Sequence, residues 1–232
     1  MAKRKTLRFA TMSGVIVLVA GLGVGLAAGV AGANNGKNVV NPDAGLSDAQ
    51  RAAMQKAAHV RNDLYLKDFV VKHRDPHTLP VVEVPTYAAP PTDLAQARSA
   101  AALVVVGKVS DVTFQSSPSG GMPLATATIA VERIVKGQAG STLVVRQLGG
   151  PVAQGSGGAL AEFDTDHLLL PGDHVLLMLS RGATDPFYRP LLGVGVNQIR
   201  ADGTVVAEES NPFRGFISGR TVAEVVATLV GP

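Results

Sequence analysis

The sequence contains no cysteine and no tryptophan among its 232 residues. Without cysteine the chain cannot form disulfides, use a thiol as a nucleophile or offer thiolates to a metal. Aromatic residues make up only 4% of the chain, which weighs against a carbohydrate-binding face, because such faces usually rely on aromatic platforms. A folded part of this chain must therefore be held together by the burial of aliphatic side chains.

Charge is missing from one long stretch near the start. Four basic residues lie within the first eight positions, and no charged residue follows until Lys37. The uncharged stretch is rich in Val, Ala and Gly, and it contains Ala31-Gly-Ala33, the small-x-small pattern that signal peptidase accepts. These features predict an export segment over residues 1–33.

Two interpretations of this segment stay open. As a signal peptide it is cleaved after Ala33, whereas as a signal anchor residues 9–33 remain as a transmembrane helix of 33 − 9 + 1 = 25 residues, enough to span a bilayer. Both place the rest of the chain outside the cytoplasm, because the basic flank stays inside. A buried helix of a soluble protein is less favoured, because the segment has no polar face.

The charge balance changes once residues 1–33 are set aside. They hold four basic and no acidic residues, so the remainder carries 21 − 4 = 17 basic and 18 acidic residues, a net charge of −1. The basic character therefore belongs to the export segment and does not indicate nucleic-acid binding. The remaining 232 − 33 = 199 residues are enough to bury a core without disulfides.

Residues 34–91 are predicted to form a stem, a helix and a linker. Residues 34–45 are rich in turn-forming residues and indicate a flexible stem. Ser47 and Gln50 form a capping box at the start of a helix whose apolar stripe is weak, so we expect it to dock loosely or to face solvent in part. Residues 76–91 contain five prolines and indicate an extended linker or a strap across the domain.

Residues 92–232 are predicted to form a β domain with a C-terminal helix. A short helix capped by Thr92 precedes the strands, and Thr221 with Glu224 forms the capping box of the last helix. The predicted strands cover 101–109, 124–137, 142–148, 174–180, 188–199 and 204–207. The apolar runs around Val105 and Leu177 indicate central strands, Gly107 allows a bend, and the broken alternation at 133–135 indicates a bulge.

Two polar stretches and one glycine-rich stretch are the candidates for chemistry. Residues 162–167 (Glu-Phe-Asp-Thr-Asp-His) could bind a hard cation or supply an acid and a base, but the glycine and distal glutamate of a calcium loop are missing, and we predict a solvated turn. His73 and His77 could bind a metal, although Pro76 prevents a helix from aligning them. Residues 149–158 lack the Gly-Lys-Ser/Thr of a phosphate loop and are predicted to be a flexible loop.

The order of several short motifs resembles that of uncharacterised exported bacterial proteins. It consists of Ala101-Ala-Leu-Val-Val-Val-Gly-Lys-Val, Val131-Glu-Arg-Ile-Val-Lys-Gly, Leu143-Val-Val-Arg-Gln and Pro171-Gly-Asp-His-Val-Leu-Leu-Met-Leu. It is also distantly similar to the netrin-like OB barrels of metalloproteinase inhibitors. The resemblance implies a small OB-like antiparallel β-barrel that acts as a binding scaffold. The cysteine-dependent inhibition of that family does not carry over, because this chain has no cysteine.

These observations predict a non-enzymatic exported module, secreted or anchored to the outer face of the cytoplasmic membrane, that binds an envelope or extracellular protein or polymer. The sequence predicts no catalytic residue, cofactor or metal site. One alternative is an extracellular hydrolase, which would draw on His167, His174, Asp164 and Asp166 for a metal, but no Gly-x-Ser-x-Gly elbow is present. Another is a structural accessory domain of a surface assembly.

Overall fold

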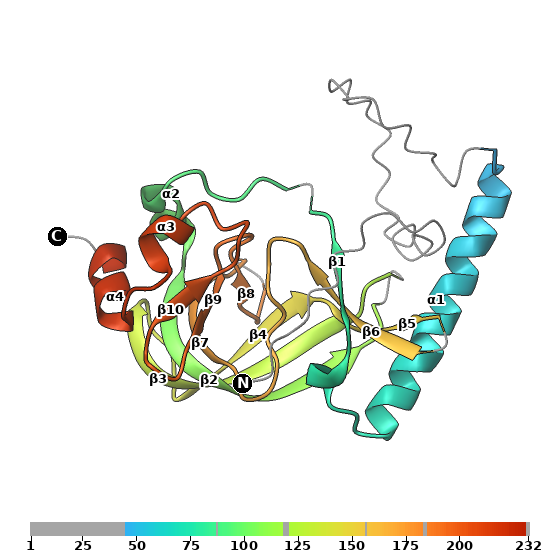
Figure 1. Cartoon of the computed structure of the whole chain (residues 1–232), viewed down its shortest axis with the longest axis horizontal. Coiled ribbons are helices and arrows are strands. Elements are labelled where there is room, and N and C mark those ends of the chain that lie inside the picture. Colours follow the sequence, from blue (N-terminus) through green and yellow to red (C-terminus); the bar gives the residue numbers. More distant parts are fainter. Residues whose placement is uncertain (1–44, 87, 118–120, 156, 183–184, 231–232) are drawn as a thin grey trace.

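The structure is a computed structural model that describes residues 45–86, 88–117, 121–155, 157–182 and 185–230 (Figure 1). These residues form a mainly β fold with flanking helices. Its helical elements are α1 (Asp48–Val71), η2 (Pro76–Thr78), α2 (Leu94–Ala100), α3 (Arg214–Ile217) and α4 (Val222–Val230). Its strands are β1 (Val81–Val84), β2 (Leu103–Gln115), β3 (Leu124–Lys136), β4 (Thr142–Leu148), β5 (Gly150–Gln154), β6 (Gly157–Phe163), β7 (His174–Ser180), β8 (Arg189–Pro190), β9 (Val196–Ile199) and β10 (Val205–Ala207).

The strands form two sheets. The larger sheet has the order β10-β9-β7-β2-β3-β4, with β8 also paired to β7, and all of these ladders are antiparallel. The smaller sheet has the order β1-β6-β5, in which β5 and β6 are antiparallel and β1 runs parallel to β6. Helices α2, α3 and α4 lie together at the end of the molecule away from α1, which runs beside the smaller sheet (Figure 1).

The two central strands of the larger sheet are buried on both faces, β7 along its length and β2 in its first half. Val104 and Leu176 pack on one face against residues of α2, α3 and α4, while Val105 and Leu177 pack on the other face against β3 and β4. Val105 and Leu177 have no exposed surface, so the prediction that they lie in covered central strands is confirmed.

The buried residues of helix α1 begin at Ala58, and the helix packs mainly through its C-terminal half. Leu66 and Phe69 contact Phe114 and Leu160 in a separate apolar cluster. Tyr65 lies directly over Gly158 of β6, so closely that a Cβ at that position would overlap the tyrosine ring. A glycine is therefore needed where the helix crosses the smaller sheet.

Two of the three predicted helix caps are confirmed. The side chain of Ser47 accepts a hydrogen bond from the backbone N–H of Gln50, whose own side chain accepts one from Ser47 N–H. Thr221 and Glu224 make the same reciprocal pair at the start of α4. The predicted cap at Thr92 is wrong by one residue, because Asp93 accepts the hydrogen bond from Gln96 N–H at the start of α2.

The predicted bend and bulge are both present in the β2–β3 pair. The register slips between Val104 and Val105, where β3 skips one residue, Val135. A second slip follows at Gly107, where an added Cβ would lie 2.5 Å from the carbonyl oxygen of Ala130. The two strands therefore approach too closely at this point for any side chain at position 107.

The glycine-rich segment 149–158 is not the flexible loop that its composition predicts. It contributes β5 and the start of β6 to the smaller sheet. The described part of the proline-rich segment likewise contains η2 and β1, with Pro85 placed just after the strand. Composition predicts these segments wrongly for two reasons. Glycines in the first segment allow close packing inside a sheet, and the prolines of the second segment lie outside the four paired residues of β1.

A closed barrel is not confirmed. The described strands form two open sheets, and only one isolated parallel bridge, Val145 to Tyr188, connects β4 with the segment that enters β8. The predicted strand over 188–199 is divided into β8 and β9, which pair with different parts of β7. The fold is thus mainly β, as predicted. The larger sheet is not closed into a barrel by continuous strand pairing.

The predicted export segment, residues 1–33, lies outside the described residues. Across residues 45–230, apart from the short gaps, no helix has the length and apolar character to cross a membrane.

Candidate functional site

The acidic turn at residues 162–167 lies where β6 leaves the smaller sheet. Asp166 N–H donates to the carbonyl of Phe163, which closes a tight turn directly after the strand. Leu168, Leu169 and Leu170 then enter the core with almost no exposed surface. The turn is therefore anchored at both ends by buried aliphatic residues.

The aspartates of this turn bind backbone groups from distant segments. Asp164 accepts a hydrogen bond from Thr86 N–H at 3.0 Å, just beyond β1. Asp166 accepts one from Gly193 N–H at 3.0 Å, in the connection between β8 and β9. The turn thus connects both sheets.

His167 is buried at the centre of this cluster, with 6% of its surface exposed. Its Nε2 lies 2.8 Å from Nε2 of Gln198, and three carboxylates lie within 4 Å of its ring: Glu162 at 3.7 Å, Asp173 at 3.7 Å and Glu208 at 3.8 Å. The prediction of a solvated turn is therefore wrong for His167, although Asp164 is exposed. Sequence reasoning missed this because Gln198 and Glu208 come from later parts of the chain.

The carboxylates nearest to His167 also hold the backbone. Glu162 accepts the N–H of Leu168 at 2.9 Å, and Asp173 accepts the N–H of Leu170 at 2.8 Å. Gln147 on β4 accepts from Leu169 N–H and donates to the carbonyl of His167. Within the described residues, no group of three or more His, Asp or Glu side chains is arranged to hold a metal ion.

The titration of Asp166 is strongly shifted by its surroundings. Burial raises the pKa of its side chain from 3.8 to about 6, and the charges of Asp164 and Glu208 act in the same direction. The hydrogen bond from Gly193 opposes the shift without cancelling it.

The other histidines that the sequence singled out are placed elsewhere. His174 lies on β7, and its Nε2 is 2.9 Å from Glu132 on β3. His73 follows α1 with a positive φ of 46°, while His77 is 2.8 Å from the carbonyl oxygen of Pro171. The residues considered for a metal-dependent enzyme therefore have separate partners.

A pocket of about 290 Å³ lies beside the acidic turn. Its walls are mainly apolar, with one carboxylate and two guanidinium groups among them. The lining residues are Leu124, Arg146, Gln147, Leu148, Phe163, Asp166, Arg189, Pro190 and Leu192.

Arg146 on β4 is the most distinctive residue of this pocket. Its guanidinium lies 3.3 Å from the centre of the Phe187 ring, and its Nε is buried without a hydrogen-bond partner among the described residues. The neighbouring Arg189 is paired with Asp185 at 2.8 Å, and the charge of Arg146 also helps to lower the pKa of that carboxyl. A buried donor without a partner is costly, about 1–3 kcal/mol, but Nε has almost no exposed surface, so an anionic ligand in the pocket would be bound by the terminal nitrogens of the guanidinium.

The sequence does not single out Arg146. Alternation along residues 142–148 assigns it to the more exposed face of the strand, opposite Leu143 and Val145, which are buried. Its only unusual feature is that it is the one cation in that strand. The stacking ring of Phe187 comes from a separate segment, and this pairing has no local sequence signal.

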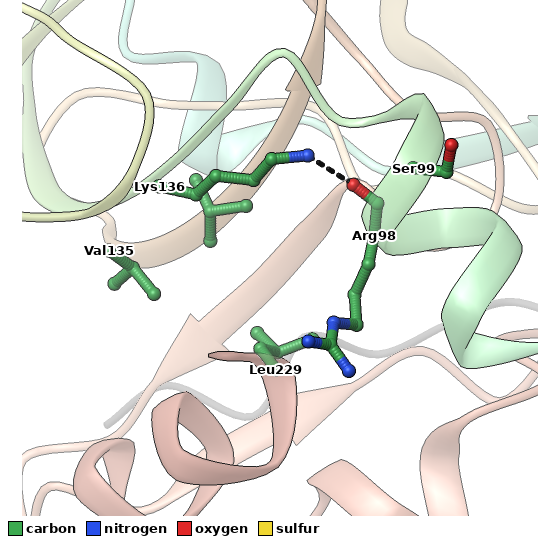
Figure 2. Close-up of a pocket in the computed structure, with 6 residues that line it drawn as sticks. Arg98, Ser99, Val135, Lys136 and Leu229 are labelled. Carbon is green, nitrogen blue, oxygen red and sulfur yellow. Dashed lines mark hydrogen bonds between the residues drawn. The ribbon is translucent and has the colours of Figure 1, made fainter. Parts of the chain in front are cut away.

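A second pocket, of about 350 Å³, lies between α2, the bulge of β3 and α4 (Figure 2). The side chains of Val135 and Leu229 line it, and Lys136 points across to the C-terminal end of α2. The Lys136 ammonium donates to the carbonyls of Arg98 and Ala101. This lysine therefore satisfies carbonyls at a helix end, and the rest of the lining combines Val104, Val135 and Leu229 with Arg98 and Ser99 of α2.

Comparison with known proteins adds no assignment to this geometry: no protein-family model matches the chain, and no curated protein sequence matches it either.

Proposed function

We propose that this protein is an exported, non-enzymatic binding module that acts in the cell envelope or outside the cell. The observation that carries the proposal is the position of the Arg146 guanidinium in the lining of a mainly apolar pocket. The ligand we infer is a segment of an extracellular or envelope protein that presents a carboxylate next to aliphatic side chains. Arg146 would bind the carboxylate, and Leu124, Leu148 and Leu192 would contact the apolar part.

The polar groups around the pocket support binding rather than catalysis. Gln147 uses both ends of its amide on the backbone at His167 and Leu169, and Asp166 holds Gly193. These groups fix the shape of the site, and a rigid wall lowers the entropic cost of ligand binding.

The location and the finer fold are also part of the proposal. The basic cluster, uncharged stretch and Ala31-Gly-Ala33 support export, with the chain either cleaved to begin at Asn34 or kept on the membrane through residues 9–33. An OB-like arrangement is supported by the isolated Val145–Tyr188 bridge, which brings β4 next to the segment that enters β8. Such scaffolds commonly bind ligands through the loops around a barrel.

Binding is tested with an array of short peptides that combine aspartate, glutamate or a free C-terminal carboxylate with Leu and Val. The full chain should bind a subset of these peptides, and Arg146→Gln should lose that binding. Arg133→Gln, which removes an exposed arginine on the neighbouring strand β3, is the matched control and should bind like the wild type. Equal binding by both variants would reject the assigned role of Arg146.

Export is tested by N-terminal sequencing of the protein recovered from cells. A chain beginning at Asn34 supports cleavage, and an intact Met1 in the membrane fraction supports the anchor. Recovery of the full chain from the cytoplasm alone would contradict both.

A further inference from the structure

Helix α1 has an apolar stripe on the face that points away from the rest of the protein. The buried face of the helix carries Ala58, Asn62, Leu66 and Phe69. On the opposite face, Val60 is 49% exposed, Leu64 is 62% exposed and Val71 is 75% exposed. Apolar side chains at these positions contribute nothing to the packing of the described fold.

The exposed stripe follows a heptad repeat. Its members recur at alternating intervals of four and three residues, the spacing of the core positions of a coiled coil. They are Ala53, Ala57, Val60, Leu64, Lys67 and Val71, all of them exposed. The structure places this seam opposite the docked face, so a second helix can lie along it without meeting either sheet.

The N-terminal half of α1 gives a second reason to expect a partner. No residue from Asp48 to Ala57 is buried, and this half stands clear of both sheets (Figure 1). Within the described residues these three turns have no buried side chain, and such a short helical stretch is marginal in water, even with the Ser47 capping box.

We propose that α1 pairs with α1 of a second copy of this chain in an antiparallel coiled coil. In the register that we infer, Ala57 faces Val60 of the second copy and Ala53 faces Leu64 of the second copy. Val71 then reaches Leu46 of the second copy, just before the helix. The small side chains lie opposite larger ones, which allows the two helices to pack closely along the seam.

The charges that flank the seam select this arrangement. In the antiparallel register Lys56 of each copy lies beside Asp63 of the other, so two attractive pairs form. A parallel pair would place Lys56 beside Arg61 and Asp63 beside Asp68 of the second copy, which are like-charge contacts.

A shift of the antiparallel pair by one heptad is also disfavoured. It would bring Asp63 next to Asp63 of the second copy, and Arg61 next to Arg61. Asp63 already contacts Lys67 of its own helix at 2.9 Å and accepts a hydrogen bond from the Ser116 hydroxyl, while 28% of its side-chain surface stays exposed and can face a second cation.

The absence of cysteine from the sequence allows a clean cross-linking test on the purified full chain. Ala53→Cys and Leu64→Cys are made separately, and each is oxidised alone and mixed with the other. The antiparallel pair predicts a disulfide-linked dimer in the mixture and little from either variant alone. A strong dimer from Ala53→Cys alone would show a parallel pair, and absence of any dimer would show that another element covers this face; either result overturns the proposal.

The charge pattern is tested by the dimer dissociation constant in sedimentation experiments. Lys56→Glu should raise that constant about tenfold by turning two attractions into two repulsions. In a parallel dimer the same change would lower it, because Glu would then face Arg61. Ala52→Glu, exposed but outside the seam, is the control and should leave the constant unchanged. An unchanged constant in Lys56→Glu overturns the proposed register.

Discussion

Replacing Asp166 with asparagine tests the electrostatics of the acidic turn directly. Asparagine has nearly the same shape, and its Oδ1 can accept the hydrogen bond that Gly193 N–H now donates to the aspartate. It cannot ionise, so the variant removes the cost of a buried negative charge and keeps the connection to the segment between β8 and β9.

The size and sign of the effect follow from the pKa. In the folded protein the pKa of the Asp166 carboxyl is about 6, against 3.8 for the ordinary group. This difference in pKa is worth ~3 kcal/mol between the two protonation states. Because the pKa is raised on folding, the folded state binds more protons than the unfolded state between these values. The stabilising contribution of the protonated group is thus fully present below pH 3.8 and is lost as pH rises through about 6.

The assay is urea unfolding of wild type and Asp166→Asn at pH 4 and at pH 7.5. We expect similar free energies of unfolding at pH 4 and an advantage for the variant of up to ~3 kcal/mol at pH 7.5. Asp111→Asn, which changes an exposed carboxylate on β2, is the control for nonspecific charge effects. A variant that differs from wild type by the same amount at both pH values would refute the burial argument for Asp166.

Three further outcomes are expected. Leu177→Ala should lower the free energy of unfolding by about 2–5 kcal/mol, because the side chain has no exposed surface, and a change below roughly 0.5 kcal/mol would contradict its central position. Gly107→Val should lower the thermal midpoint by several degrees, since its Cβ would lie 2.5 Å from the Ala130 oxygen, whereas an unchanged midpoint would mean that β2 and β3 can separate there freely. Calorimetric titration with calcium and with zinc should show no tight binding at residues 162–167; a one-to-one isotherm at micromolar affinity, abolished by joint replacement of Asp164 and Asp166 with asparagine, would restore the metal-site hypothesis.

The strands that the sequence predicts well are those with continuous or alternating apolar runs. The runs that contain Val105 and Leu177 are long enough to define β2 and β7, and β4 and β7 begin and end where predicted. These patterns predict strands correctly because a strand that is buried on one or both faces has alternating or continuous apolar residues along its own sequence.

The smaller sheet was not predictable in the same way. Its strands contain Gly157, Gly158 and Pro151, which local propensity assigns to loops. Position 158 must be glycine because Tyr65 of α1 lies over it, and β6 gains a second partner because β1 comes from far away in the sequence to pair with it. Both causes are tertiary, and neither leaves a local pattern.

The candidate site shows the same limit. The sequence locates the cluster at 162–167. The hydrogen-bond partners of its side chains are Thr86, Gly193 and Gln198, which are distant in the chain. The sequence of an acidic stretch next to an apolar segment is the same whether its side chains face solvent or bind backbone groups of other segments.

The parallel pairing of β1 with β6 has a consequence for the order in which the protein folds. Val81 pairs with Leu160, 160 − 81 = 79 positions later, whereas in the β5–β6 pair Gln154 is paired with Gly157, close by in the sequence. Closing the longer loop costs ~3 kcal/mol more in chain entropy, so β1 should be a late addition to a hairpin that already exists. As a four-residue strand at the edge of its sheet, it should also open first, and its amides should exchange with solvent hydrogen long before those of β2 and β7.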